Sequence, residues 1–286
     1  MFKRQTAGSV VCASCGSLVG VNDATCYSCG RRNPGLWGYG PALRRLGNDL
    51  GFVPFVTGTC IVVYVLMLVV SGAGSLRLGG LMNFLSPSVY AELMFGASGA
   101  VPVFQYGHWW TVLSASFLHG SLLHIFFGIL WIRQLAPAVA DLYGAGRMVI
   151  IYTVAGVAGF LLSSIAGEVL GGLPIPILRG GPLTVGSSAA IFGLLGAVVY
   201  YGRRAGSSAA GSQAWQYAVI MFVMGLMMPG IDNYAHAGGF AGGYVAGRIL
   251  DPLKPERVNH LLGAVICLLL SVLSILASVV SWLFLR

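Results

Sequence analysis

Two glycine-rich stretches of the sequence carry residues that could act as a nucleophile and a base. The first, residues 184–193, begins a long apolar segment and contains the adjacent serines Ser187 and Ser188. The second, residues 233–243, begins another apolar segment and contains His236. A serine hydroxyl becomes a nucleophile when a histidine within about 2.6–3.2 Å accepts its proton. The two stretches therefore predict a Ser–His dyad, provided that the two segments lie in contact.

Small residues around the serines and His236 favour such a contact, but they could also serve only to pack the helices together. Most serines in membrane helices only pack, with the hydroxyl bonded to their own backbone. Glycines in G-x-x-x-G patterns usually mark close helix packing. Both interpretations fit the glycines that follow His236, because close packing would also bring a serine within reach of the imidazole. These are Gly238, Gly239, Gly242, Gly243 and Gly247.

Acidic residues are too few to favour other hydrolytic sites. Asp232 lies four residues before His236, in the turn between two apolar segments, and is not clearly placed to orient the ring. We therefore expect a Ser–His dyad rather than a Ser–His–Asp triad. The sequence has neither an H-E-x-x-H motif nor paired aspartates in its apolar segments, which disfavours a metalloprotease and an aspartyl protease.

The composition places most of the chain in a membrane. Of 286 residues, 57% are apolar and only 8% are charged, and the mean hydropathy is +0.83. A soluble domain of this size carries about 25% charged residues. The net charge of +8 comes from basic residues at the ends of apolar segments rather than from a stripe interleaved with aromatics. We therefore expect no nucleic-acid partner.

Seven apolar segments are each near the length of about 20 residues that spans a bilayer. They predict an all-α polytopic membrane protein with a six-span core at 52–252, followed by a cytoplasmic loop and a seventh span at 253–286. Residues 89–110 are semi-polar and predict an interfacial loop with short helices. The expected spans are 53–71, 112–132, 148–167, 183–202, 214–230, 234–250 and 261–284.

Basic residues predict the orientation in the cell membrane, because they concentrate in cytoplasmic segments. With the N-terminus inside, thirteen basic residues lie inside and three outside, and the C-terminus lies outside. Ser188 and His236 then lie just below the outer face, at one level with His119 and His124 of the second span. The outer three are Arg77, Arg179 and Arg286; the inner ones are Lys3, Arg4, Arg31, Arg32, Arg44, Arg45, Arg133, Arg147, Arg203, Arg204, Arg248, Lys254 and Arg257.

Four cysteines near the N-terminus form two C-x-x-C pairs, Cys12 with Cys15 and Cys26 with Cys29. Each pair is followed by glycine, a spacing typical of the knuckles of a zinc ribbon. We predict that residues 1–32 bind one structural Zn²⁺ and that 33–51 form a linker. A redox dithiol or two disulfides are the alternatives, and the reducing cytoplasm disfavours disulfides.

On these residues, the chain resembles the rhomboid intramembrane serine proteases over about residues 53–250. The family's G-x-S motif is similar to Gly186-Ser187-Ser188, which makes Ser188 the counterpart of the nucleophile. Its A-H-x-G-G motif is similar to residues 235–239, which makes His236 the base. Its F-L-H-G-S-x-x-H motif is similar to residues 117–124, which include His119 and His124. Phe192 stands where the family often has an aromatic packed on the catalytic imidazole.

The chain departs from the family pattern at three positions. The residue four positions after His124 is Gly128 instead of an asparagine whose amide helps to stabilise the oxyanion. The loop Trp-Arg pair is replaced by Trp110-Thr111, and Ala189 replaces the glycine after the nucleophile. The resemblance then leaves His124 and the Ser188 amide to hold the oxyanion, with room for a water beside Gly128. Loss of one such donor typically costs about 10²–10³ in rate.

The resemblance implies an intramembrane serine endopeptidase that cleaves transmembrane segments of other proteins, with no cofactor for catalysis. The alternative is a catalytically impaired relative that binds transmembrane helices, with the zinc module recruiting a cytoplasmic protein partner. A transporter is disfavoured, because the polar groups gather near one face and no inverted repeat of broken helices is visible.

Overall fold

The computed structural model describes the whole chain except residues 1–2, 45, 74–82, 175–177, 229 and 285–286. Arg45, Arg77 and Arg286 of the charge count lie outside the described residues. The rest is mostly helical, as the composition predicts.

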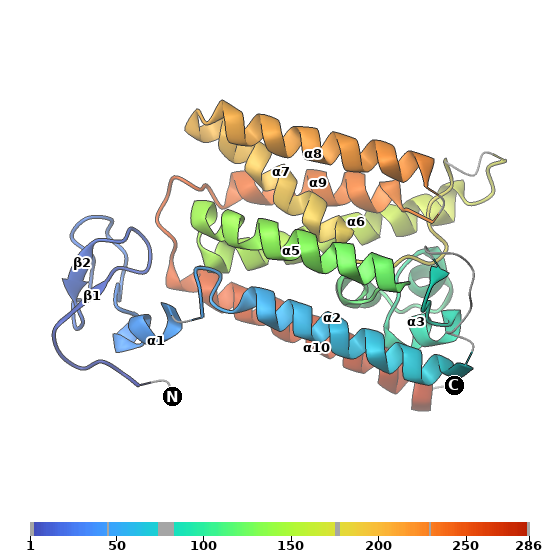
Figure 1. Cartoon of the computed structure of the whole chain (residues 1–286), viewed down its shortest axis with the longest axis horizontal. Coiled ribbons are helices and arrows are strands. Elements are labelled where there is room, and N and C mark those ends of the chain that lie inside the picture. Colours follow the sequence, from blue (N-terminus) through green and yellow to red (C-terminus); the bar gives the residue numbers. More distant parts are fainter. Residues whose placement is uncertain (1–2, 45, 74–82, 175–177, 229, 285–286) are drawn as a thin grey trace.

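In the described part of the chain, seven long helices follow one another in the order of the predicted segments (Figure 1). The same residues also form short helices and one two-stranded sheet. The long helices are α2 (Phe52–Ser71), α5 (Leu122–Tyr143), α6 (Ala145–Leu170), α7 (Ser188–Ala205), α8 (Ser208–Met227), α9 (Asn233–Ile249) and α10 (Val258–Phe284). The short elements are β1 (Ser9–Val11), β2 (Leu18–Gly20), η1 (Leu36–Gly38), α1 (Gly40–Arg44), α3 (Val89–Phe95), η4 (Val101–Gln105), α4 (Thr111–Ser114) and η5 (Ala115–Phe117).

Four of the described helices are long and apolar enough to cross a membrane: α2, α5, α6 and α10. The other three long helices, α7, α8 and α9, include polar residues such as Arg203, Gln213 and Gln216, which lower their hydropathy. α7 and α9 are also short, with 18 and 17 residues. The protein is therefore a multi-pass, all-α membrane protein.

The predicted second span, 112–132, is wrong by about ten residues. Its first part forms α4 and η5, and the long helix begins only at Leu122. Ser121 caps this start by accepting a hydrogen bond from the amide of His124, at 3.3 Å. A serine at this position stabilises a helix start. His119 therefore lies in the turn before α5, whereas His124 lies in its first turn.

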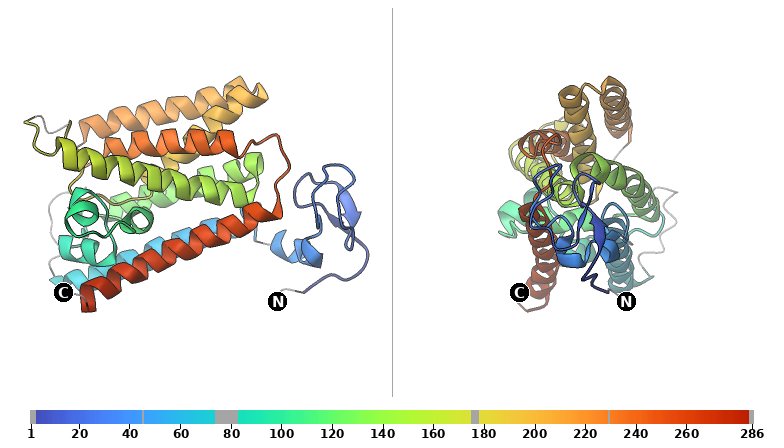
Figure 2. Two further views of the ribbon diagram at one scale, coloured as in Figure 1. Left: turned by 180° about the vertical axis from the view of Figure 1, so that it is seen from behind. Right: turned by 90° about the vertical axis from the view of Figure 1, so that its left-hand side faces the viewer.

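The helices form one elongated bundle, with the cysteine-containing module at one end and α3 at the other (Figures 1 and 2). The C-terminus lies at the α3 end. The start of α7 lies at this end as well, because Ser98 and Thr184 exchange backbone hydrogen bonds of 3.0 and 2.7 Å. The start of α7 and the cysteine module thus lie at opposite ends of the bundle.

Glycines on α9 allow its backbone to touch that of α7, as the spacing predicts. A methyl group on Gly239 would lie 2.0 Å from the carbonyl oxygen of Ala189. A methyl group on Gly243 would lie 2.0 Å from the carbonyl oxygen of Gly193. Neither approach is compatible with a side chain, so these two glycines set the distance between the helices that carry the serines and His236.

The N-terminal module is a small hairpin held to the membrane part by polar contacts. β1 and β2 pair antiparallel, with Val10 opposite Val19. Arg31 of the module and Glu256 of the α9–α10 connection form an ion pair of 3.7 Å, with side chains 1% and 6% exposed. The amide of Glu256 donates to the hydroxyl of Ser14 at 3.0 Å. The predicted linker 33–51 contains η1 and α1.

Candidate active site and metal centre

Ser188 and His236 form a hydrogen-bonded pair across the contact of α7 and α9. The Ser188 Oγ lies 3.0 Å from His236 Nε2. Ser188 is the first residue of α7 and is partly exposed, whereas His236, in the first turn of α9, is 5% exposed. This is the distance that proton transfer from a hydroxyl to an imidazole requires. The structure thus brings together the two residues from which the sequence predicted a dyad.

The imidazole of His236 is held on one face by Phe192. The two rings stack with centroids 4.1 Å apart and an interplanar angle of 13°. Phe192 lies one turn after Ser188 on α7, so the same helix presents the hydroxyl and supports the imidazole that bonds to it. The position that the family resemblance assigned to Phe192 agrees with this contact.

Asn233 holds the other nitrogen of His236 and was missed by the sequence analysis. Its Oδ1 lies 3.3 Å from His236 Nδ1. Because an amide oxygen can only accept, Nδ1 carries the proton and Nε2 is free to accept the hydroxyl hydrogen of Ser188. Asp232 does not touch the ring; it caps α9 by accepting from the amide of Ala235 at 3.0 Å, and it also bonds to Ser163.

The adjacent serine has a different partner. The Oγ of Ser187 lies 3.2 Å from Nε2 of His119, and both side chains are 0% exposed. Ser188 is the accessible member of the two serines, and Ser187 is the buried one. Burial therefore separates two neighbouring serines that spacing alone cannot tell apart.

The place beside Gly128 holds two polar protein side chains. A methyl group on Gly128 would lie 2.7 Å from both His119 Nε2 and Ser187 Oγ. The two polar side chains fill the space next to the bare backbone of α5.

His124 lies against the residues that precede Ser188. The amide of Gly120 donates to its Nδ1 at 3.4 Å, so Nε2 carries the proton. A methyl group on Gly186 would lie 2.5 Å from that Nε2. Gly186 also has φ +130°, which side chains rarely allow, so glycine is required there on two grounds. His124 thus presents an N–H donor at the entrance to α7.

Backbone hydrogen bonds fix the segment that leads into α7. Besides the Ser98–Thr184 bridge, the amide of Gly186 donates to the carbonyl of Ala115 at 2.9 Å. The start of α7 is therefore fixed by backbone hydrogen bonds to Ser98 and to Ala115, in addition to the bonds within the helix.

Thr111, which stands where the resemblance expected an arginine, begins α4. Its hydroxyl donates to the carbonyl of His108 at 2.7 Å. Trp110 beside it donates from Nε1 to the hydroxyl of Ser278 at 3.0 Å. Trp110 thus anchors the loop to α10, whereas the Thr111 hydroxyl bonds within the loop.

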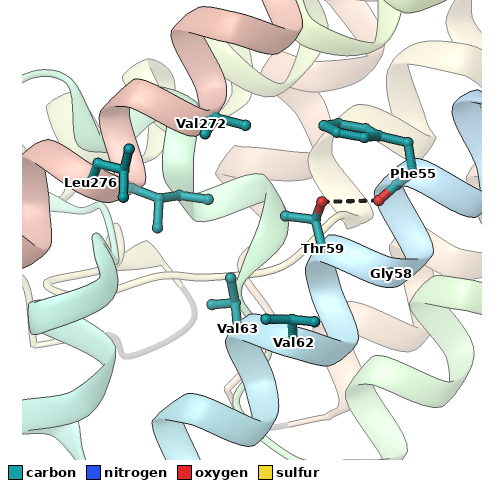
Figure 3. Close-up of a pocket in the computed structure, with 8 residues that line it drawn as sticks. Phe55, Gly58, Thr59, Val62, Val63, Val272 and Leu276 are labelled. Atoms are coloured by element: carbon teal, nitrogen blue, oxygen red, sulfur yellow. Dashed lines mark hydrogen bonds between the residues drawn. The ribbon is translucent and has the colours of Figure 1, made fainter.

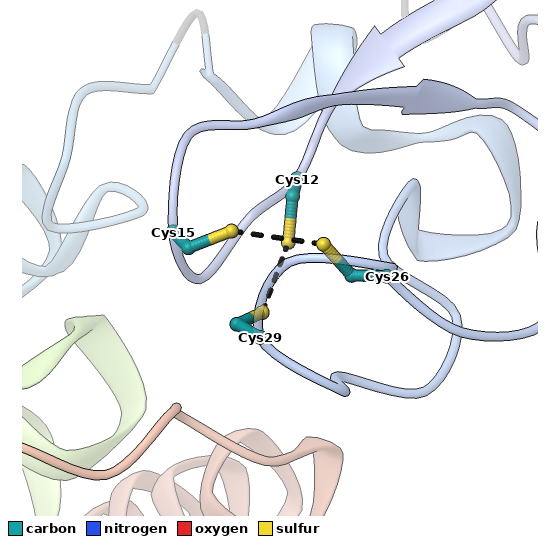
Figure 4. Close-up of side chains that lie close together, drawn as sticks. All are labelled: Cys12, Cys15, Cys26 and Cys29. Carbon is teal, nitrogen blue, oxygen red and sulfur yellow. Dashed lines mark hydrogen bonds between the residues drawn. The ribbon is translucent and has the colours of Figure 1, made fainter.

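The four N-terminal cysteines converge on one point, as their spacing predicts (Figure 4). Their Sγ atoms all lie within 4.8 Å of one another, with 3.8 Å between Cys12 and Cys29 and 3.6 Å between Cys15 and Cys26. Sulfur atoms about 3.8 Å apart are those of a tetrahedral site with metal–sulfur bonds of about 2.3 Å. The cluster can therefore hold a metal ion.

The environment of the thiols differs within the cluster. Burial raises the pKa of Cys29 to about 12 and raises that of Cys12 as well. Hydrogen bonds to Ser17 lower the pKa of Cys15 to about 6. Because metal ions bind thiolates, loading of the cluster releases protons from the buried cysteines.

An apolar groove of about 390 Å³ lies between α2 and α10, away from these residues (Figure 3). Its lining includes Phe55, Val62 and Leu276, and its one hydroxyl, of Thr59, donates to the Phe55 carbonyl at 2.9 Å. None of the candidate catalytic residues lines it.

Comparison with known proteins decides the family. The sequence model of the Rhomboid domain matches residues 106–252, about half of the chain. The chain belongs to the rhomboid family. The matched region begins directly after η4, ends just past α9, and contains Ser188, His236 and His124. In this rhomboid, the cysteine module precedes the matched region and α10 follows it.

Several curated rhomboid proteins are similar to this chain. Rhomboid protease GluP of Bacillus subtilis (strain 168) is 33% identical over 195 residues, which cover 67% of this chain and 36% of that protein. RHOMBOID-like protein 4 of Arabidopsis thaliana is 28% identical over 170 residues, covering 58% and 40%. Rhomboid-like protease 5 of Toxoplasma gondii is 33% identical over 168 residues, covering 57% and 18%. This rhomboid matches well under two thirds of the length of these relatives.

Proposed function

We propose that this rhomboid protein is a serine endopeptidase that cleaves transmembrane segments of other membrane proteins. The observation that supports this most is the 3.0 Å contact between the Ser188 hydroxyl and His236 Nε2. The names of two of the relatives, Rhomboid protease GluP and Rhomboid-like protease 5, agree with this activity. The paired and partly accessible serine favours a protease over a relative that only binds helices.

In the proposed reaction, Ser188 Oγ attacks the carbonyl carbon of the scissile bond. His236 Nε2 takes the hydroxyl proton and then gives it to the leaving amine, which breaks the peptide bond and leaves an acyl-enzyme. A water then attacks the ester, with His236 again accepting the proton and returning it to Ser188. Asn233 keeps the imidazolium oriented through its bond to Nδ1.

The developing oxyanion is held by N–H donors near the start of α7. We assign this role to the Nε2–H of His124 and the backbone amide of Ser188. The helix start supports this, because the first amides of a helix have no partner within the helix and favour negative charge. α7 has no side-chain cap, which leaves these amides open.

We infer that the protein lies in the cell membrane with its N-terminus in the cytoplasm and its C-terminus outside. The cysteine module and the start of α7 lie at opposite ends of the bundle, which supports an active site near the outer face. Substrate helices would enter from the lipid, and residues that weaken a helix would ease cleavage, because a peptide bond within an intact helix is shielded from attack.

We propose four segments with distinct roles: a zinc-ribbon-like module at 1–32, a linker at 33–51, the six-span core at 52–252, and the loop and seventh helix at 253–286. Cys12, Cys15, Cys26 and Cys29 would hold one structural Zn²⁺, for which four thiolates are a typical ligand set. A hydrogen bond and an ion pair join the module to Glu256 of the α9–α10 connection, and a separate cytoplasmic partner stays a prediction.

The protease assignment is tested with purified protein in detergent and a transmembrane reporter. We expect cleavage by the wild type and none by Ser188→Ala or His236→Ala. Equal cleavage by Ser188→Ala would show that the assignment is wrong. For the module, elemental analysis should give about one zinc per chain, and zinc retained in Cys12→Ser plus Cys26→Ser would contradict the metal site.

A further inference from the structure

A second serine–histidine pair lies directly beside the candidate nucleophile and takes no part in the proposed proton transfer. Ser187 and His119 are fully buried, and their side chains bond to each other at 3.2 Å. A buried polar group is costly unless it has a partner, so each member of this pair depends on the other.

The pair occupies a notch in α5 that exists because residue 128 is glycine. A methyl group there would lie 2.7 Å from Ser187 Oγ and 2.7 Å from His119 Nε2, closer than such atoms approach. Glycine is a poor helix former, so its presence inside a helix points to a packing requirement. The helix can carry no side chain at residue 128 while the pair is formed.

The pair also touches both halves of the proposed oxyanion site. Ser187 is linked directly to Ser188, whose amide is one donor. The His119 ring meets the ring of His124, the other donor, edge to face, with centroids 5.0 Å apart and an angle of 73°. A hydrogen bond from Ser187 to His119 and a ring contact from His119 to His124 therefore connect the start of α7 with the imidazole that α5 carries.

We propose that His119 and Ser187 are a positioning pair, which sets the place of the Ser188 amide relative to the His124 imidazole, and that Gly128 is required to admit it. The inference rests on the proposed protease function, because the distance between the Ser188 amide and the His124 imidazole affects catalysis only if both groups bind the same oxyanion. Neither residue touches substrate. A misplacement of about 1 Å in such a site can lower the rate by about 10²-fold.

The test compares kcat and KM of Ser187→Ala, Gly128→Ala and the double variant on a transmembrane reporter. Ser187→Ala lowers kcat about tenfold and leaves KM unchanged, because substrate binding does not use the pair. Gly128→Ala lowers kcat by about 10²-fold. In the double variant the new methyl group takes the room of the lost hydroxyl and the His119 ring can shift, so kcat returns to the level of Ser187→Ala.

Ser164→Ala is the matched control. Ser164 is equally buried, but its hydroxyl donates to the Phe160 carbonyl of its own helix at 2.7 Å. We expect wild-type kcat from this variant. Wild-type kcat in Ser187→Ala, or a double variant no more active than Gly128→Ala, would overturn the positioning pair while leaving the protease assignment intact.

Thermal unfolding of the same variants gives a readout that does not depend on activity. The double variant is expected to unfold at a higher temperature than Gly128→Ala, because the clash with the hydroxyl is relieved. Equal or lower unfolding temperature would show that Ser187 does not occupy the notch, whatever the activity. A wild type that does not cleave any reporter would count against the proposed function, and with it the catalytic role of the pair.

Discussion

The ring of Phe192 lies flat against the imidazole of His236, with centroids 4.1 Å apart, one helical turn from Ser188. Stacked aromatic pairs contribute about 0.5–1.5 kcal/mol beyond the area they bury. We therefore expect Phe192→Leu, which keeps an apolar side chain but loses the stack, to lower kcat by up to about tenfold. Phe192→Tyr keeps the stack and should retain most of the activity. Equal rates for the Leu and Tyr variants would show that the stack does not orient the base.

Asn233 should be needed to keep His236 in the correct tautomer. Removing its Oδ1 in Asn233→Ala frees the ring to turn or to carry its proton on Nε2, where it cannot accept from Ser188. We expect kcat to fall by about 10–10²-fold, within the range of general-base contributions, with little change in KM. Kinetics of reporter cleavage measure both values.

A neighbouring position offers an independent check on Asn233. A methyl group on Gly225 of α8 would lie 2.4 Å from Asn233 Oδ1, so Gly225→Ala displaces the amide without removing it. Gly225→Ala should therefore lower kcat, as Asn233→Ala does. Full activity in both variants would exclude Asn233 from the site.

Much of the site could be predicted from the sequence, because its main groups lie in short local motifs. Ser188, His236 and Phe192 each occur at the start of an apolar segment, where spacing and the family resemblance assign them. The two cysteine pairs that begin at Cys12 and Cys26 also depend only on neighbouring residues, since each pair lies within one tight turn. In these places the neighbouring residues determine the geometry.

The parts that could not be predicted depend on contacts between distant segments. The fit of Ser187 against Gly128 requires the exact placement of α7 against α5, which no spacing within either helix reveals. Asn233 is a polar residue at the start of α9, beside Asp232, and nothing local distinguishes its role. The late start of α5 did have a local signal, because Ser121 is a good helix cap, but the apolar run from Val112 concealed it.

Gly239 should be among the residues least tolerant of substitution. A methyl group there would meet the Ala189 carbonyl oxygen at 2.0 Å and force α9 away from α7. Gly239→Ala should therefore abolish cleavage and lower the unfolding temperature. Gly58 of α2 is the matched control, because a methyl group there meets nothing within 4 Å. Gly58→Ala should be stable and active. A Gly239→Ala protein with the same activity and unfolding temperature as Gly58→Ala would refute the close contact between α9 and α7.

The ion pair between Arg31 and Glu256 should hold the cysteine module against the α9–α10 connection. Both side chains are nearly buried, and removing one partner of a buried pair typically costs about 3–5 kcal/mol. Glu256→Ala should therefore release the module and make residues 33–51 more susceptible to limited proteolysis. Lys254→Ala is the control, since that side chain is 73% exposed. Equal proteolysis of the two variants would contradict a docked module.

Ser188, activated by His236, is the proposed nucleophile. Mass spectrometry after treatment of the purified protein with a serine-reactive fluorophosphonate tests this assignment most directly. We expect one adduct per chain on Ser188, absent in Ser188→Ala, strongly reduced in His236→Ala, and still formed in Ser187→Ala. An adduct on Ser187, or labelling that persists unchanged in Ser188→Ala, would contradict it.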